Sequence, residues 1–219
     1  MRAFYPFVRN VIDILQAGSV RMDPSLLRVE FLCDHRVSAR VPLAEVLPKH
    51  GIGAEIGVFT GLFSTILLRV AQPKKMYFID PWWKYSGSHF GDWGPYTDHG
   101  KLSTTLAHQV ASVRIQRHAH ETQVEIVVDY SSTFLPKVPD GYFDWVYLDS
   151  AHSYQKVSAE LSMLRTKVKS GGIVAGDDWY DNPAHVHAGV AEAVKEAVTR
   201  RKFESLTILP AFQWTIRVP

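Results

Sequence analysis

The chain has 219 residues, of which 46% are hydrophobic, so it is long enough for one folded domain with a substantial core. Its 24 basic residues face 22 acidic ones, a balance that argues against the basic track of a nucleic-acid-binding protein. A single cysteine, Cys33, excludes an internal disulfide framework. No apolar run is long enough to span a bilayer, and the first residues lack the apolar core of a signal peptide, so we expect a cytoplasmic protein.

Residues 1–50 are expected to form a helical extension in front of the main domain. Residues 7–15 have helical spacing, residues 26–31 fit either a helix or a strand, and residues 42–48 fit a short helix bracketed by prolines. No motif in this stretch indicates chemistry. We therefore place the main domain at residues 51–219.

The main domain opens with a glycine-rich turn. A short apolar run that carries Glu55 ends in Gly57, and Gly61 follows just before an apolar helical segment. Glycine tolerates positive φ and lets a ligand approach the backbone, while the start of a helix offers unpaired N–H groups to a negative ligand group. The turn therefore predicts a ligand site, although a glycine-rich turn in an unrelated α/β protein would have the same sequence pattern.

The second strand of the main domain ends in an acid. Residues 76–79 form a short apolar run that is typical of a buried parallel strand, and Asp80 follows it. An acid at this place can accept hydrogen bonds from both hydroxyls of a ribose. Asp80 can instead merely begin the turn before Pro81. We favour the ribose role because the glycine turn precedes it.

An aromatic loop follows at residues 82–99, with tryptophan, tyrosine, phenylalanine and histidine among glycines and polar residues. Aromatic rings on such a loop can form the wall or lid of a pocket for a flat or sugar-like ligand. The same rings can instead form a small hydrophobic cluster under a long loop. The sequence leaves both readings open.

The remaining elements alternate between helices and strands and end in a hairpin of two edge strands. Their expected ranges are 102–113 (helix), 124–128 (strand), 143–148 (strand), 157–168 (helix, stopped by Gly171-Gly172), 173–175 (strand), 186–198 (helix) and 206–216 (hairpin). Asp129 and Ser131 follow the third strand and can cap a turn there. This order predicts an α/β fold: a doubly wound, mostly parallel seven-stranded sheet with helices on both faces and a C-terminal antiparallel hairpin.

Three carboxylates follow the last two parallel strands: Asp149 after the fourth, and Asp177 and Asp178 after the fifth. Parallel strand ends meet at one edge of a sheet, so these groups are expected close together, where they repel one another. A hard divalent cation such as Mg²⁺ removes that conflict and can orient a substrate hydroxyl, with Asp149 or His152 receiving its proton. Alternatively, Asp177 caps the turn and only one of the three acids faces the site.

Several motifs in this order resemble the Rossmann-like methyltransferases that use S-adenosylmethionine, near the Mg-dependent macrocin and aminocoumarin sugar O-methyltransferases. The motifs are Glu55-x-Gly57-x-x-x-Gly61, Ile79-Asp80-Pro81-Trp82, Leu148-Asp149 through His152-Ser153-Tyr154, and Gly171-Gly172 through Asp177-Asp178-Trp179. The resemblance implies Mg²⁺ on Asp149, Asp177 and Asp178, and N-terminal helices that cover the cofactor or form a subunit contact. It also implies a set of cofactor-binding residues: Glu55, Gly57, Gly61, Asp80, Asp129, Ser131 and Asp149.

We therefore predict a methyltransferase that moves a methyl group from S-adenosylmethionine to a hydroxyl of a small molecule, such as a sugar or another natural-product-like acceptor. The alternatives are a metal-independent small-molecule methyltransferase, an NAD-binding oxidoreductase and a non-catalytic binding protein on the same fold. The oxidoreductase would need the Gly-x-Gly-x-x-Gly spacing after the first strand, which is absent. We expect no nucleic-acid or membrane partner, and a possible homodimer.

Overall fold

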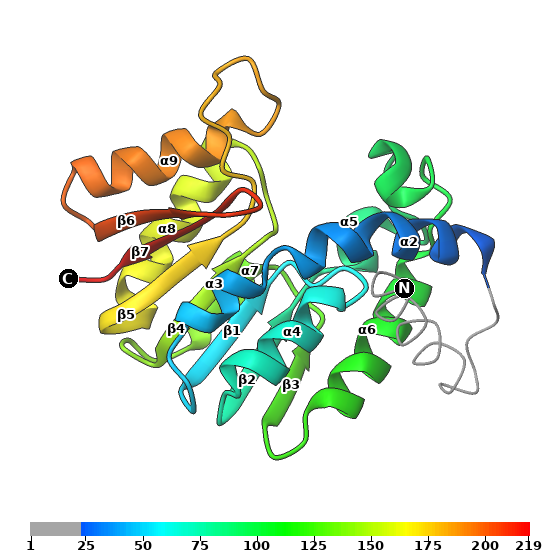
Figure 1. Ribbon diagram of the computed structural model, residues 1–219, viewed down its shortest axis with the longest axis horizontal. Helices are drawn as coiled ribbons and strands as arrows, with labels where there is room; N and C mark the ends of the chain where they lie inside the picture. Colours follow the sequence, from blue (N-terminus) through cyan, green and yellow to red (C-terminus); the bar gives the residue numbers. More distant parts are fainter. Residues whose placement is uncertain (1–22) are drawn as a thin grey trace.

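The computed structural model describes residues 23–219, which form one seven-stranded sheet in the order β3-β2-β1-β4-β5-β7-β6 (Figure 1). Strands β1 to β5 pair in parallel, and β7 pairs antiparallel with both β5 and β6. The strands are β1 (Ile52–Ile56), β2 (Lys75–Ile79), β3 (Gln123–Val127), β4 (Phe143–Leu148), β5 (Val168–Gly176), β6 (Glu204–Leu209) and β7 (Gln213–Arg217). The predicted fold class is confirmed. The strand order reverses between β1 and β4, and open α/β sheets bind ligands beside such a point.

Helices cover both faces of the sheet (Figure 1). They are α2 (Pro24–Ser38), α3 (Val41–Val46), α4 (Leu62–Ala71), α5 (Trp83–Ser86), α6 (Thr104–His118), α7 (Ser131–Phe134), α8 (Tyr154–Lys167) and α9 (Ala188–Thr199), with short 3₁₀ turns η1 (Gly94–Thr97) and η2 (Leu135–Lys137). Among the described helices, none combines the length and the apolar character that crossing a bilayer requires.

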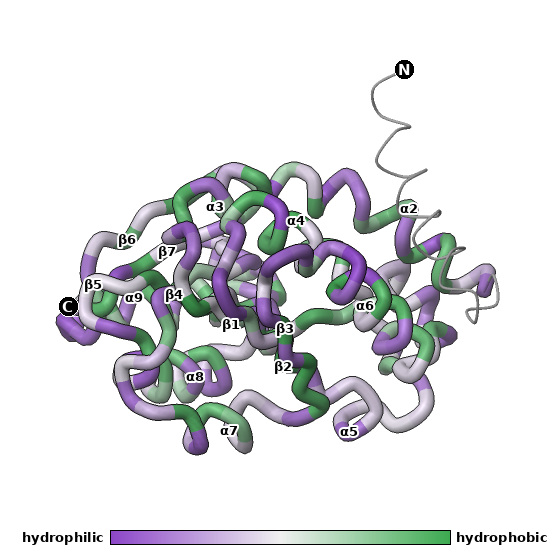
Figure 2. The backbone as a smooth tube through the Cα atoms, turned by 90° about the horizontal axis from the view of Figure 1, so that it is seen from below, coloured by the Kyte–Doolittle hydropathy of each residue, from purple (hydrophilic) through white to green (hydrophobic). Residues whose placement is uncertain are grey.

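The sheet separates two hydrophobic cores, and β4 shows why. Its side chains alternate, so Trp145 and Tyr147 join the core under α2, α3, α4 and α6, whereas Val146 and Leu148 join the core under α8 and α9. Figure 2 shows hydrophobic residues along β2, the parallel strand that follows β1 in the chain. A strand with two apolar faces is the expected form of a buried parallel strand. This double cover fixes the carboxyl ends of the strands, where the site lies.

Three sequence predictions about elements need correction. Gly171-Gly172 does not stop a helix: α8 ends at Lys167, and both glycines lie inside β5. The helix expected from residue 186 begins at Ala188, and Val186 is exposed. Only β6 is an edge strand of the hairpin, because β7 inserts between β5 and β6. For the two glycines and for β7, the pairing of strands decided the outcome, and local spacing does not contain that information.

The helix α2 covers residues 24–38, so residues 26–31 are helical and not a strand. The helix α3 confirms the short helix that was predicted at residues 42–48. Asp23 caps α2 by accepting from the backbone N–H groups of Ser25 and Leu26 at 2.8 and 3.1 Å. The apolar side chains of α2 join the core of α4 and α6. The helix predicted at residues 7–15 lies outside the described residues, and the division at residue 50 stays a prediction.

A buried ion pair ties α2 to the main domain. Arg114 of α6 donates to both carboxylate oxygens of Glu30 at 2.9 and 2.6 Å, and to the backbone carbonyl of Thr60 at 2.8 Å. Both charged side chains are almost completely buried. Because Thr60 belongs to the glycine turn, this one guanidinium connects α2, α6 and the turn.

Candidate active site

The glycine turn between β1 and α4 has the backbone geometry that the sequence predicts. Gly57 has φ +89° and Gly61 has φ +75°, a region that favours glycine. A Cβ on Gly57 would lie 2.0 Å from the backbone oxygen of Asp149, and one on Gly61 would lie 2.9 Å from Cα of Ala111. Close approach of the protein's own backbone thus explains both glycines, where the sequence pointed to a ligand.

The start of α4 is open to a ligand. Gly61 is its N-cap residue, and no described side chain caps its first N–H groups. In addition, the hydroxyl of Thr60 is buried without a hydrogen-bond partner among the described residues. Unsatisfied donors at a helix start attract a negative group such as a carboxylate. The turn therefore offers what an anionic ligand group needs.

Asp80 lies directly beside this turn and is 8% exposed. One of its oxygens accepts from the backbone N–H groups of Val58 and Phe59, both at 2.9 Å, and the other accepts from Trp82 at 2.8 Å. Burial raises the pKa of Asp80, and these three donors act against that shift. Asp80 therefore fixes the turn and also starts the next one, as the structural alternative foresaw. Its contact with a ribose stays a prediction.

Glu55 is not exposed to a ligand but contacts another side chain of the protein. It is buried in β1, and its carboxylate accepts from the hydroxyl of Ser64 in α4 at 2.5 Å. Burial raises the pKa of Glu55 well above its ordinary value. This bond joins the strand to the first turn of the helix behind Gly61. Glu55 can therefore influence a ligand only by holding α4 in position.

Asp129 and Ser131 lie after β3, the outermost parallel strand. Asp129 accepts from the N–H of Tyr130 at 2.9 Å, and its carboxylate lies 3.3 Å from the ammonium group of Lys84. Ser131 donates to Glu160 at 2.6 Å, as Ser150 does at 2.9 Å. The contact of Asp129 and Ser131 with a cofactor stays a prediction.

Sequence reasoning missed Glu160, a buried acid that joins the loops after β3 and β4. A signal was present, because Glu160 falls on the apolar face that Val157, Leu161 and Leu164 form on α8. A charged residue on such a face is rarely buried unless it has partners.

We call Asp149, Asp177 and Asp178 the acid cluster. As predicted, the structure brings them together: each offers a carboxylate oxygen, and these oxygens lie within 4.8 Å of one another. The side chain of Asp149 is 25% exposed, whereas those of Asp177 and Asp178 are 2% and 5% exposed. A ligand can therefore reach Asp149 most readily.

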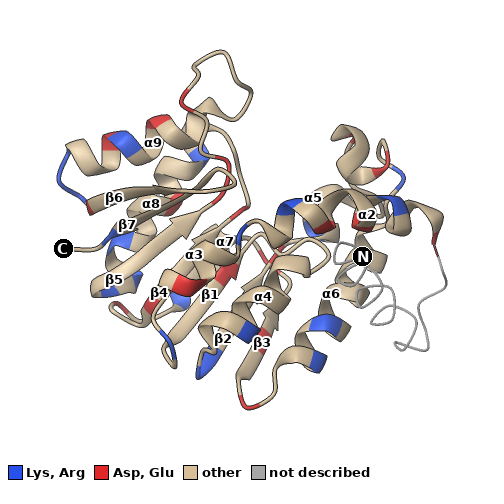
Figure 3. Ribbon diagram, in the orientation of Figure 1, with Lys and Arg blue, Asp and Glu red and all other residues tan. Residues whose placement is uncertain are grey.

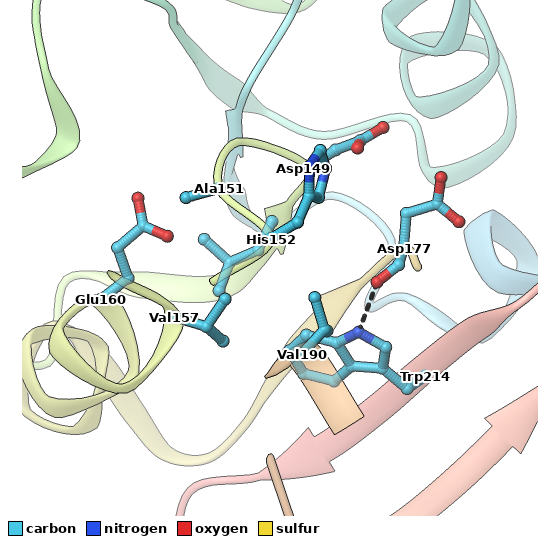
Figure 4. A pocket seen from close by; sticks show the side chains of 9 residues that line it. Asp149, Ala151, His152, Val157, Glu160, Asp177, Val190 and Trp214 are labelled. Atoms are coloured by element: carbon cyan, nitrogen blue, oxygen red, sulfur yellow. Dashed lines mark hydrogen bonds between the residues drawn. The ribbon is translucent and has the colours of Figure 1, made fainter. Parts of the chain in front are cut away.

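The floor of the pocket beside the acid cluster is apolar (Figure 4). The side chains of Asp149 and Asp177 lie in the same part of the view, and those of Val157, Val190 and Trp214 lie below them. The indole N–H of Trp214 donates to the backbone carbonyl of Asp177 at 2.9 Å. This bond joins β7 to the end of β5, in addition to the antiparallel pairing of the two strands.

Two arginines meet the acid cluster from the N-terminal extension. Arg40 donates to Asp149 at 2.8 Å and also to Asp177. Arg36 donates to Asp178 at 2.8 Å and to Asp177 at 3.3 Å. Figure 3 shows basic and acidic residues on α2, and acidic residues on the segment after β5. Neither arginine was predicted to have a role, because nothing in the local sequence pattern connects residues 36 and 40 with a strand end.

The three acids of the cluster differ in the direction in which their pKa values are shifted. Burial raises the pKa of Asp177 to about 7, and the charge of Asp149 adds to that shift although Arg40 opposes it. Burial also disfavours the ionised forms of Asp149 and Asp178. Arg40 outweighs it at Asp149 and His152 outweighs it at Asp178, so both pKa values lie below the ordinary range. Asp149 and Asp178 are therefore ionised at neutral pH.

His152 is, besides Asp149, the residue that the sequence predicts as the proton acceptor. Its Nε2 lies 2.9 Å from Asp178, and its ring stacks on His187 with centroids 4.2 Å apart. Burial lowers the pKa of His152, but hydrogen bonding to Asp149 and Asp178 prevails and raises it to about 10. This raised pKa favours a protonated His152 at neutral pH, which argues against its predicted role as a general base; that role stays a prediction. Burial lowers the pKa of His187, which leaves that ring neutral.

The sequence left two interpretations of the aromatic loop open: a pocket wall or lid, and a small hydrophobic cluster. Part of the loop is buried and part is exposed. Trp82 and Phe90 are buried, and the indole of Trp82 donates to the backbone carbonyl of Phe59 in the glycine turn at 2.9 Å. Trp83 and Trp93 are 40% and 49% exposed. Tyr96 accepts from Arg36 at 2.6 Å. One part of the loop therefore supports the turn, and another part contacts Arg36, which binds the acid cluster.

With this geometry in view, comparison with known proteins decides the family. A model of a methyltransferase-domain family matches residues 54–179, more than half of the chain. The chain belongs to this methyltransferase family. The match runs from β1 to the residue after Asp178, so it contains both the glycine turn and the acid cluster. Among curated proteins, none matches the sequence of this methyltransferase.

Solved structures share the fold at low sequence identity. A Corynebacterium glutamicum protein has TM-score 0.55 and 11% identity over 98% of this chain and 96% of its own. A putative methyltransferase from Streptococcus mutans, in complex with SAH, has TM-score 0.53 and 15% identity over 84% of this chain and 96% of its own. The O-methyltransferase TomG from Streptomyces achromogenes, in complex with SAM, has TM-score 0.51 and 18% identity over 95% and 96%. At these identities the likeness concerns the fold.

Proposed function

We propose that this methyltransferase moves a methyl group from S-adenosylmethionine to a hydroxyl of a small molecule. The observation that carries the proposal is the family match, which spans the glycine turn and the acid cluster together. The complexes of the S. mutans protein with SAH and of TomG with SAM support the choice of methyl donor. TomG and a Bacillus cereus relative with TM-score 0.53 are O-methyltransferases, which supports a hydroxyl as the acceptor group.

The residues around the glycine turn fit the proposed cofactor. When bound, S-adenosylmethionine supplies an electrophilic methyl group on a sulfonium. The open N-terminus of α4 suits the carboxylate of its methionine part. Asp80, at the end of β2, is the acid nearest to the turn and is the proposed partner of the ribose, provided that the ligand takes over some of its present hydrogen bonds.

Asp149 is the residue that we assign to the acceptor hydroxyl. It is the most exposed member of the acid cluster, and it is ionised at neutral pH. Arg40 holds one of its oxygens, so the carboxylate has a fixed direction. A carboxylate of low pKa is a weak base and removes a proton most readily from an acidic hydroxyl. We therefore extend the predicted sugar-like acceptors to phenols and expect phenols to react faster.

The predicted Mg²⁺ ion stays a prediction, and the contacts of the acid cluster argue against it. Three carboxylate oxygens within 4.8 Å of one another would suit one hard cation. However, Arg40 and Arg36 already occupy oxygens of all three acids. A metal ion does not fit without displacing these arginines, so we assign no step of the reaction to it.

Ligand binding by the full chain tests the proposal. We expect S-adenosylmethionine and its demethylated product to raise the melting temperature, and NAD to leave it unchanged. Methyl transfer is then measured with donor labelled on its methyl group and a panel of phenols and sugars. Stabilisation by NAD alone would contradict the proposal and favour an oxidoreductase. Stabilisation by the donor, with no labelled product from any acceptor class, would favour a binding protein.

A further inference from the structure

The chain itself supplies a positively charged group, the guanidinium of Arg40, to the acid cluster. Asp149 and Asp177 are the two acids that a shared metal ion would bridge, and the guanidinium of Arg40 binds one oxygen of each. Arg36 bridges Asp177 and Asp178 in the same way. The second oxygen of Asp177 accepts from the amide of Gln213. Each acid of the cluster therefore has at least one oxygen that is held by a nitrogen donor.

The two arginines also supply the charge that a metal would bring. Guanidinium groups remain protonated at any pH that a folded protein meets, so Arg36 and Arg40 together carry two positive charges. A divalent cation carries the same two charges. Each guanidinium offers several donors in a planar fork, which matches paired carboxylate oxygens. The repulsion that led us to expect Mg²⁺ is thus met by side chains.

Arg40 is held in place independently of the acids. Its side chain is 8% exposed and lies over the ring of Phe63, with 5.6 Å between the guanidinium carbon and the ring centroid. It also donates to the hydroxyl of Tyr147 at 3.2 Å, and that hydroxyl donates to Gln213 at 3.0 Å. Its backbone is fixed as the N-cap residue of α3. A metal ion that entered here would leave a buried guanidinium unpaired, which is costly.

We propose that Arg40, with Arg36, is the resident cation of the acid cluster, so that this site works with two guanidinium groups in the place of a divalent metal ion. Arg40 is then a positioning residue: it holds Asp149 ionised and oriented toward the acceptor. That catalytic consequence rests on the proposed function. The exclusion of a metal ion from between Asp149 and Asp177 does not, because it follows from the contacts of Arg40 and Arg36 alone.

Binding of Mn²⁺ tests the exclusion directly, because its electron paramagnetic resonance signal separates free from bound ion without any enzyme assay. We expect no bound ion with the unaltered full chain. Arg40→Met keeps much of the side-chain length and uncovers the carboxylates, and we expect it to bind one Mn²⁺ per chain, at least about tenfold more tightly than the unaltered chain. Arg40→Lys keeps a positive charge and serves as the matched control, with no gain in binding.

Arg36→Met is the second variant in case Arg40→Met does not fold, since Arg36 is more exposed, at 27% of its side chain. Circular dichroism and urea unfolding establish folding for each variant. Stoichiometric Mn²⁺ binding by the unaltered chain that Asp149→Asn abolishes would overturn the proposal. A folded Arg40→Met or Arg36→Met variant without any gain in binding would also overturn it. Failure of methyl transfer would count against the proposed function and leave the Mn²⁺ result standing.

Discussion

The two acidic regions of the site are held in different ways. Asp80, at the end of β2, accepts from three backbone N–H groups that lie at most 22 residues away in the chain. The acid cluster, at the ends of β4 and β5, is held by arginines 109 to 142 residues away. The first region is built into the turn itself, whereas the second is complete only when α2 and α3 pack over the sheet. Experiments can separate the two.

The largest effect is expected where the two regions are joined, at Arg114. Arg114→Met removes one partner of a buried ion pair and leaves Glu30 charged and unpaired, which costs about 3–5 kcal/mol of unfolding free energy. Urea unfolding measures this loss. The double variant Glu30→Leu with Arg114→Met removes both charges and should recover most of it. Equal losses in the single and double variants would mean that packing, rather than the ion pair, ties α2 to the turn.

A smaller loss is expected at the backbone contact between the regions. Gly57→Ala combines strain at positive φ with a contact of 2.0 Å to the backbone of Asp149, and together these cost about 2–4 kcal/mol of unfolding free energy. Gly141→Ala is the matched control, because Gly141 has φ +60° and no described atom lies within 4 Å of its added Cβ. The difference between the two variants isolates the close approach. Equal destabilisation would show that backbone strain alone accounts for Gly57.

Asp80→Asn should affect the first region and spare the second. The amide nitrogen would face backbone N–H groups that need an acceptor, so we expect a loss of about 1–3 kcal/mol of unfolding free energy and weaker binding of S-adenosylmethionine. Urea unfolding and calorimetry measure the two effects. Asp129→Asn is the control, because Asp129 is more exposed, and we expect a smaller change in stability. If Asp80→Asn changes neither quantity, Asp80 does not hold the turn.

A pH dependence of stability belongs to the second region. The pKa of His152 is raised to about 10 in the folded protein, against about 6.5 in an unfolded chain. Its protonation therefore stabilises the fold fully below pH 6.5, and this contribution is lost as pH rises through 10. Unfolding free energies of the unaltered chain and of His152→Gln, measured across this range, should converge at high pH. Parallel curves would show that His152 does not gain a proton on folding.

The fold and the composition of the acid cluster were predictable because both follow from local patterns. Apolar runs placed β1 to β5, and each acid of the site directly follows a strand. The arginines were not predictable in this way, since Arg36 and Arg40 lie in a helical extension whose partners depend on tertiary packing. The insertion of β7 beside β5 was missed for the same reason. The base assignment of His152 stays a prediction, and the raised pKa that its hydrogen bonds to Asp149 and Asp178 cause argues against it.

A crystal structure of the full chain with S-adenosylhomocysteine tests the central claim most directly, because it shows where the demethylated donor binds relative to the two regions. We predict its carboxylate at the N-terminus of α4, its ribose beside Asp80, and its sulfur facing the side of Asp149, with Arg40 still bound to the acid cluster. A ligand bound elsewhere on the sheet, or a metal ion in the place of the guanidinium of Arg40, would contradict the account.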